Sequence, residues 1–116
     1  MHYPTFLEPR LRDFTEHIFK SIGCSDTHAV LAADVLLKSD LRGIDSHGVA
    51  RLSGYVRLWE KKRINPTPDI KIVHETATTA TVDGDAGLGL VVAPFAMKIA
   101  LQKAEQYGSG WVSVRN

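Results

Sequence analysis

The segment Asn65-Pro66-Thr67-Pro68-Asp69 constrains the fold of this chain more than any other feature. Each proline lacks an amide donor and restricts the residue before it, so neither a helix nor a central strand can pass through the segment. Apolar residues before it recur at helical spacing, whereas those after it form short β-branched runs. We therefore expect a subdomain edge here, with an N-terminal helical segment over residues 1–64 and the start of an α/β sheet domain over residues 65–116.

The sequence before the prolines has the pattern of three helices. The first is marked by apolar residues at helical spacing, which are Leu11, Phe14, Ile18, Phe19 and Ile22. Gly23 follows them where a left-handed C-terminal cap is expected. Ser25 and Asp26 then begin an alanine- and leucine-rich helix that reaches about Leu41, and Gly43 closes it.

The third helix is expected from about His47 to Lys62. One of its faces is apolar and should be buried, and it consists of Leu52, Tyr55, Val56 and Trp59. Ser46 is a good N-cap residue, because its side-chain oxygen can accept from an unpaired amide of the first turn. Arg51 lies at the edge of the apolar face, which predicts a partly desolvated guanidinium, whereas Arg57 is expected to be solvated.

Strands and one further helix are expected after the prolines. Ile70–His74 and Ala77–Val82 have the β-branched content of strands and are expected to form a hairpin around Glu75-Thr76. A helix from about Leu90 to Tyr107 and a final strand from Trp111 follow. The sequence thus predicts a mixed α/β fold, with N-terminal helices followed by strands and a helix packed on a sheet.

The turn Gly87-Leu88-Gly89 invites a dinucleotide interpretation, since glycines let a pyrophosphate approach backbone amides. However, Val92 occupies the place of the third glycine, and no acidic residue ends a second strand about 20 positions later. We therefore interpret Gly84–Gly89 as a structural turn, assign no cofactor-binding residue and expect a non-Rossmann fold.

Composition and charge exclude several classes of protein. With 44% hydrophobic and 23% charged residues, the chain has the balance of a folded globular domain, and its net charge of +1 suggests neither nucleic acid nor a membrane as partner. Cys24 is the single cysteine, which excludes an internal disulfide. We expect its side chain to pack in the interior, and a lone cysteine fits a reducing cytoplasm. The histidines His17, His28 and His74 lie on separate elements and lack metal-ligand spacing, so no metal site is expected. No apolar run spans a bilayer, and a signal peptide pattern is missing, which again favours the cytoplasm.

Asp40–Leu52 is the segment with most chemistry in this chain. The guanidinium of Arg51 can hold a carboxylate through two parallel hydrogen bonds. His47 can exchange a proton near neutral pH with a carbonyl oxygen. Ser46 is either the helix cap or a hydrogen-bond partner of the reacting oxygen. This set suits a 2-oxo or 2-hydroxy acid as substrate.

The residues alone also allow other interpretations. His47 can be a capping or surface histidine, and Arg51 can form an exposed ion pair with Asp45. A nucleophilic triad of Asp45, Ser46 and His47 is disfavoured because consecutive residues point in different directions.

A third alternative is a non-enzymatic interaction module that docks a partner chain. Its contact surface would be the apolar face of the third helix, with Tyr55 and Trp59. Such a module would associate with a partner without catalysing a reaction.

Asp40–Leu52 resembles the signature of the type 2 malate/L-lactate dehydrogenase family of nicotinamide-dependent 2-hydroxy-acid oxidoreductases. The segments Ala29–Lys38, Val82–Gly89 and Trp111–Asn116 occur in the same order in that family, so the resemblance covers nearly the whole chain. It implies reversible reduction of a 2-oxo acid with NAD or NADP, with His47 as acid/base, Arg51 as carboxylate anchor and Ser46 as a further substrate contact.

Members of that family are much longer chains, and many are homodimers. The resemblance therefore implies that these 116 residues are the N-terminal portion of a larger fold and are inactive alone. It places a second histidine motif and the main cofactor-binding loops after the last residue. Neither the particular 2-oxo acid nor the choice between NAD and NADP follows from this sequence.

Overall fold

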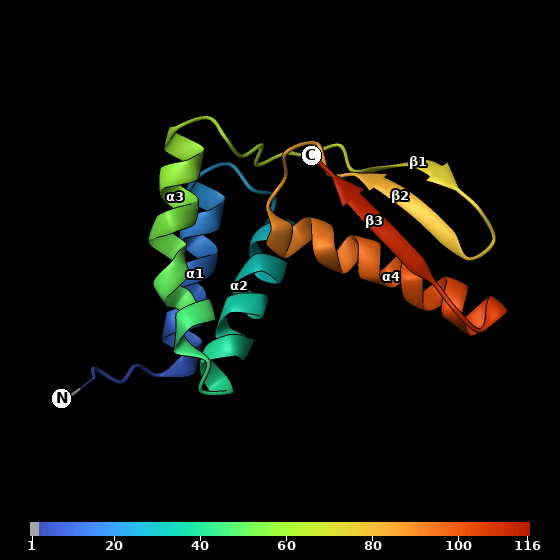
Figure 1. Ribbon diagram of the computed structural model, residues 1–116. Coiled ribbons are helices and arrows are strands. Elements are labelled where there is room, and N and C mark those ends of the chain that lie inside the picture. The colour runs from blue at the N-terminus through green and yellow to red at the C-terminus, as the bar shows by residue number, and fades with distance from the viewer. Residues whose placement is uncertain (1–2) are drawn as a thin grey trace. The chain divides into compact units, whose positions relative to one another are not determined.

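A computed structural model describes residues 3–116 of the chain (Figure 1). It divides into two compact units, of which the first ends at Lys62 and the second runs from Arg63 to Asn116. The boundary thus lies two residues before the one expected after residue 64. The first unit contains α1 (Glu8–Ser21), α2 (Asp26–Leu41), two 3₁₀ turns η1 (Asp45–His47) and η2 (Val49–Arg51), and α3 (Leu52–Glu60). The second contains β1 (Lys71–Glu75), β2 (Thr79–Asp83), α4 (Gly89–Tyr107) and β3 (Trp111–Arg115). Within residues 3–116, no helix combines the length and apolar character needed to span a membrane.

α1 and α2 form a helical pair whose bounds match the expected ones closely. The Ser25 side chain accepts a hydrogen bond from the amide of His28 at 3.2 Å, which confirms it as the N-cap of α2. Gly23 has φ +105°, a left-handed conformation that favours glycine. Of the apolar residues that mark α1, Phe14 is 55% exposed while Phe19 is fully buried. The core of the pair is completed by Ile22, Ala29, Ala32, Ala33, Leu36 and Leu37.

The third helix is shorter than expected at both ends. It begins at Leu52 rather than His47, because Gly48 adopts an extended conformation (φ −92°, ψ −147°) that separates η1 from the following helical residues. It ends at Glu60, and Lys62 takes a positive φ of +56°. The chain therefore crosses the expected start of the helix as two 3₁₀ turns, which changes the geometry of the candidate site.

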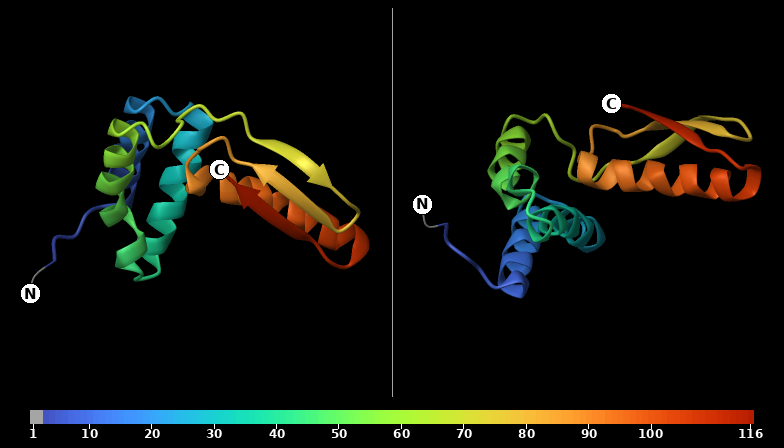
Figure 2. Two further views of the ribbon diagram at one scale, coloured as in Figure 1. Left: turned by 45° about the horizontal axis from the view of Figure 1, so that its top comes forward. Right: turned by 60° about the horizontal axis from the view of Figure 1, so that its bottom comes forward.

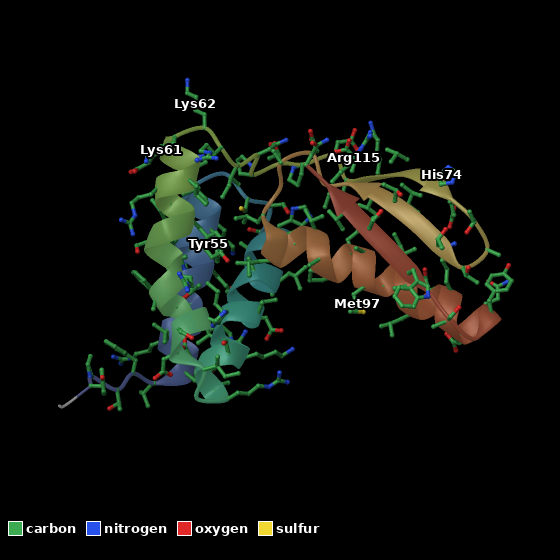
Figure 3. All side chains as sticks on the ribbon, in the orientation of Figure 1. Tyr55, Lys61, Lys62, His74, Met97 and Arg115 are labelled. Atoms are coloured by element: carbon green, nitrogen blue, oxygen red, sulfur yellow. The ribbon has the colours of Figure 1, made fainter. Side chains whose placement is uncertain are left out.

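The expected apolar face of α3 is only partly buried. Leu52 is buried, whereas Trp59 is 37% exposed. Tyr55 is half-buried and its ring lies 6.2 Å from that of Phe19 in α1, measured between centroids (Figure 3). Tyr55 therefore packs against α1 within the first unit. Of the two aromatic residues named for the docking alternative, Trp59 is the one that is exposed.

The second unit is a three-stranded sheet of order β1-β2-β3 with α4 along one face (Figures 1 and 2). β1 and β2 are antiparallel, and α4 connects β2 to the parallel strand β3. The inner face of the sheet packs on the helix through Ala80, Val82, Val92, Ala96 and Ile99. The mixed α/β fold is confirmed.

The hairpin turn lies slightly later than expected. Glu75 belongs to β1, and β2 begins at Thr79 rather than Ala77, with the amide of Thr76 donating to the Thr79 carbonyl at 2.9 Å. Lys103 of α4 is only 8% exposed, and its Nζ lies 2.7 Å from the Thr76 carbonyl oxygen and 2.8 Å from Glu75 Oε1. This buried ammonium fixes the hairpin to the helix.

α4 ends as expected. Gly108 has φ +88° and its amide donates to the Ala104 carbonyl at 2.8 Å, a left-handed C-terminal cap.

Candidate active site

The turn that bears the candidate residues, 44–51, is held by the end of α2. The Asp40 carboxylate accepts a hydrogen bond from the amide of Val49 at 2.8 Å. A β-carbon on Gly48 would overlap the same carboxylate, so only glycine fits at this position. Asp40 therefore caps the helical stretch that starts with η2, from nine residues upstream.

The expectation that Ser46 caps the third helix is wrong. Ser46 lies inside η1, and its Oγ is 2.8 Å from Nδ1 of His47. The helix does not need the serine, because the Asp40 carboxylate already accepts from Val49. Of the two roles left open for the hydroxyl, that of helix cap is thus removed, and the hydroxyl supports the imidazole instead.

Arg51 contacts the same residue. Its Nε donates to the backbone carbonyl of Ser46 at 2.7 Å. Among residues 3–116, no side chain or carbonyl pairs with its two terminal guanidinium nitrogens, and no ion pair joins it to Asp45. The guanidinium is exposed, so the expectation of partial desolvation is wrong for this structure.

His47 and Arg51 are brought together, although not as successive turns of one helix. They lie in separate 3₁₀ turns and share Ser46 as a support, through its hydroxyl and its carbonyl. The second imidazole nitrogen of His47, Nε2, has no partner among the described residues, and the ring is exposed. The arrangement leaves one imidazole nitrogen and the guanidinium fork without a partner among the described residues.

A hollow of about 670 Å³ opens beside the turn. On the turn its walls are Asp40, Asp45, Val49 and Ala50, and they are completed by α1, by the end of α2 and by the segment from Tyr3 to Phe6. Ser46, His47 and Arg51 do not line it. Within the first unit, the three candidate residues therefore stand on an open surface.

The glycine turn of the second unit packs on the proline segment and is held by carboxylates. A β-carbon on Gly87 would lie 2.8 Å from Pro68 Cγ, so this glycine allows the close packing on Pro68. Asp85 accepts from the Asn65 side chain and the Asp69 amide, both at 2.9 Å, and its own amide donates to Asp83 at 3.0 Å. That amide lowers the pKa of the Asp83 carboxyl, and a carboxylate beside the turn disfavours a phosphate there.

The single cysteine is a packing residue in this structure. Cys24 is 7% exposed and unpaired. Burial raises the pKa of its thiol, which keeps it in the unreactive protonated form.

A sequence profile described as malate/L-lactate dehydrogenase matches residues 7–116. The chain belongs to the malate/L-lactate dehydrogenase family. Its relatives in that family include the L-sulfolactate dehydrogenase of Methanocaldococcus jannaschii, 44% identical over 85% of this chain, and the malate dehydrogenase of Pyrococcus abyssi, 42% identical over 99% of it. The solved malate dehydrogenase of Pyrococcus horikoshii superposes on 98% of this chain with a TM-score of 0.94 and 38% identity. The family resemblance inferred from sequence is thus confirmed.

The match covers only part of each relative. This member of the malate/L-lactate dehydrogenase family spans 29% and 32% of the two curated relatives, and 33% of the solved Pyrococcus horikoshii chain. Roles for His47, Ser46 and Arg51 are therefore argued below from the local geometry of the turn.

Two residues of the site were missed by sequence reasoning. Asp40 and Gly48 stand in the segment that suggested the family, yet neither was given a role. Their contact joins positions eight residues apart through a bend, so no helical or strand periodicity reveals it. The available signal was an acidic residue at the end of one helix and a glycine just before the next.

Proposed function

We propose that the protein carrying this chain transfers a hydride reversibly between NAD(P)(H) and a 2-hydroxy or 2-oxo acid, with His47 as acid/base and Arg51 as carboxylate anchor. The observation that supports this most is that both side chains are held by Ser46. Its hydroxyl is hydrogen-bonded to His47 and its carbonyl accepts from Arg51. Their unpaired nitrogens are the groups that such a substrate requires, one for its carboxylate and one for its reacting oxygen.

Arg51 is proposed to orient the acid. Its Nε is occupied by the Ser46 carbonyl, which fixes the plane of the guanidinium and leaves the two terminal nitrogens for a bidentate contact.

His47 is proposed to exchange the proton at Nε2. During reduction it donates that proton to the carbonyl oxygen while the carbonyl carbon is reduced, and in the reverse direction it takes the hydroxyl proton back. Ser46 can support both states, because a hydroxyl either donates to an unprotonated Nδ1 or accepts from a protonated one. When it accepts from Nδ1, its own proton is free to contact the substrate, which is the role that the resemblance implies for Ser46.

NAD or NADP is proposed as the hydride carrier, and no contact with it is assigned to the glycine turn of the second unit, where the Asp85 carboxylate accepts from the Asp69 amide. The substrate is proposed to be a small 2-oxo or 2-hydroxy acid, a class to which the malate and L-sulfolactate of the relatives' names belong. A homodimeric assembly and a cytoplasmic location also remain proposals. The polypeptide of residues 1–116 is proposed to be inactive alone, since its three candidate residues stand on an open surface.

The test is oxidation of NADH and NADPH by the whole protein with a panel of 2-oxo acids and their amides. We expect turnover with one or more acids and little with the matched amides, because the amides lack the charge that Arg51 binds. Arg51→Ala should reduce this preference. If Arg51→Ala raised KM equally for acids and amides, the anchor role would be wrong.

A further inference from the structure

We propose that Asp40 is a positioning residue for the reaction, which acts by fixing the turn that bears His47 and Arg51. The proposal rests on the proposed function for its kinetic consequence only. The Asp40 carboxylate is hydrogen-bonded to neither the His47 nor the Arg51 side chain. It instead holds the backbone of the turn that contains both residues.

The first observation is the cap itself. Asp40 is half-buried at the end of α2, and its Oδ2 accepts from the amide of Val49, the first residue of η2. A carboxylate at the N-terminal end of a helical stretch makes a charge-assisted hydrogen bond and also interacts favourably with the positive end of the helix dipole. The bond therefore determines where the helical stretch begins.

The second observation is the fit of Gly48. A β-carbon on Gly48 would overlap the Asp40 carboxylate, so a side chain there would displace the group that accepts from the Val49 amide, and the glycine is buried. Its φ of −92° is available to any residue, so it is the neighbouring carboxylate that favours glycine here. Gly48 thus leaves free the space that the capping carboxylate occupies.

The residue before Asp40 holds the other end of the turn. The Ser39 hydroxyl donates to the carbonyl of Ile44 at 3.0 Å, and the Ile44 amide donates to the Ser39 carbonyl at 2.9 Å. Two successive residues of α2 thus fix the start and the end of the segment that contains Ser46 and His47.

The consequence for chemistry follows from the competition for a cap. In the presence of Asp40, the Ser46 hydroxyl is free to bind His47 Nδ1. Without Asp40, the Val49 amide loses its acceptor, and Ser46 is a strong capping residue close to it. We therefore expect loss of Asp40 to withdraw the support of the imidazole and to shift the carbonyl on which Arg51 rests.

The experiment compares Asp40→Ala and Asp40→Asn with Asp34→Asn in the whole protein. Asp34 lies on the same helix, is similarly half-buried and forms ion pairs with Arg12 and Lys38, so its variant controls for loss of a carboxylate from α2. Hydrogen exchange of residues 44–52 and the kinetics of 2-oxo acid reduction are measured for each. The Asp40→Asn side chain keeps an oxygen that can accept from Val49, so it should rescue most of the loss.

We expect Asp40→Ala to accelerate exchange over residues 44–52 at least tenfold while α1 keeps its protection, and to lower kcat/KM for the acid by about 10- to 100-fold, through kcat and KM together. Asp34→Asn should change neither. Unchanged exchange over residues 44–52 in Asp40→Ala would overturn the proposal, as would equal effects of Asp40→Ala and Asp34→Asn. If Asp40→Ala does not fold, Asp40→Asn is the deciding variant. We expect it to keep most of the activity, and complete loss of activity in that variant would also overturn the proposal. The exchange result stands even if the unaltered protein reduces no 2-oxo acid, an outcome that would contradict only the proposed function.

Discussion

The turns 44–51 and 84–89 are alike in composition and opposite in the use of their polar groups. Each contains glycine, each precedes a helix, and each is held by carboxylates that accept from backbone amides. In turn 44–51 the carboxylate is supplied from outside, by Asp40, so the polar side chains inside the turn remain available. In turn 84–89 the carboxylate inside the turn, that of Asp85, is itself occupied, because it accepts from the Asn65 side chain and the Asp69 amide, while the Asp85 amide donates to Asp83 at the end of β2.

A polar turn becomes a candidate site when the hydrogen bonds that hold it are made by other residues. Asp85 accepts two hydrogen bonds that the fold requires, and none of its described contacts is with a side chain suited to catalysis. His47 and Arg51 each have one nitrogen engaged by Ser46 and the others unpaired among residues 3–116. The predictions below test this contrast, from the largest expected effect on activity to the smallest.

Replacing His47 should have the largest effect. His47→Ala or His47→Gln removes the group that exchanges the proton, and general acid/base catalysis contributes about 10²- to 10⁴-fold. We expect a loss of this size in kcat with 2-oxo acids, measured from NAD(P)H oxidation by the whole protein. His74→Ala is the matched control, because His74 is an exposed histidine on β1 and should leave kcat unchanged (Figure 3).

Replacing Arg51 should mainly weaken substrate binding. Hydrogen bonds to a charged group contribute about 1.5–3 kcal/mol, which corresponds to roughly 10- to 150-fold in kcat/KM. We expect Arg51→Ala to raise KM for the acid by this factor and Arg51→Lys to restore only part of it, because lysine lacks the planar fork. Arg57→Ala serves as control on the same helical stretch, where the guanidinium is exposed and bonds to Ser53. An equal rise in KM for Arg57→Ala would contradict specific anchoring.

Placing a side chain on Gly48 tests how the Asp40 carboxylate holds turn 44–51. Gly48→Ala would overlap the Asp40 carboxylate, and overpacking of this kind costs about 1–3 kcal/mol. We expect lower stability in denaturant unfolding and a kcat/KM reduced about tenfold. In an Asp40→Ala background the same substitution should cost much less, because the overlapping group is gone. Additive effects of the two substitutions would show that the overlap does not control the turn.

Removing the Ser46 hydroxyl should have a modest effect. A single neutral hydrogen bond contributes about 0.5–1.5 kcal/mol, so Ser46→Ala should lower kcat about 2- to 10-fold through loss of the support at Nδ1. Helix content and the unfolding midpoint should not change, because Asp40 and not Ser46 provides the cap. A clear drop in helix stability measured by circular dichroism would restore the capping role to Ser46.

Replacing Asp85 should leave activity nearly unchanged. Asp85→Ala removes the acceptor of the Asn65 side chain and the Asp69 amide, so it should destabilise the second unit by about 1–2 kcal/mol. kcat and the KM values for acid and cofactor should stay within about twofold of the unaltered protein after correction for the folded fraction. A selective rise in the KM of the cofactor would reveal a function for this turn that its geometry does not suggest.

Local signals in the sequence predict the helices and the sheet well. Ser25 and Gly23 mark helix ends through backbone preferences, and the apolar spacing around Phe19 finds the buried face of α1. The hairpin and α4 follow from β-branched runs and from Gly108 in the same way. Each of these features depends on residues close together in the chain.

The internal support of the site could not be predicted by the same means. The third helix begins late because Asp40 reaches a distant amide, and the exposure of Arg51 depends on what surrounds the turn. Ser46 is a good N-cap by its own preference, and it loses that role only because a stronger acceptor comes from another helix. Long-range competition for one amide leaves no periodic trace in the sequence.

A crystal structure of the whole protein with an unreactive 2-oxo acid analogue such as oxamate tests the account most directly. We predict that its carboxylate occupies the two terminal nitrogens of Arg51, that its carbonyl oxygen lies about 3 Å from Nε2 of His47, and that Ser46 stays hydrogen-bonded to Nδ1. An analogue bound with His47 and Arg51 pointing to different regions, or with Ser46 withdrawn to the Val49 amide, would contradict it.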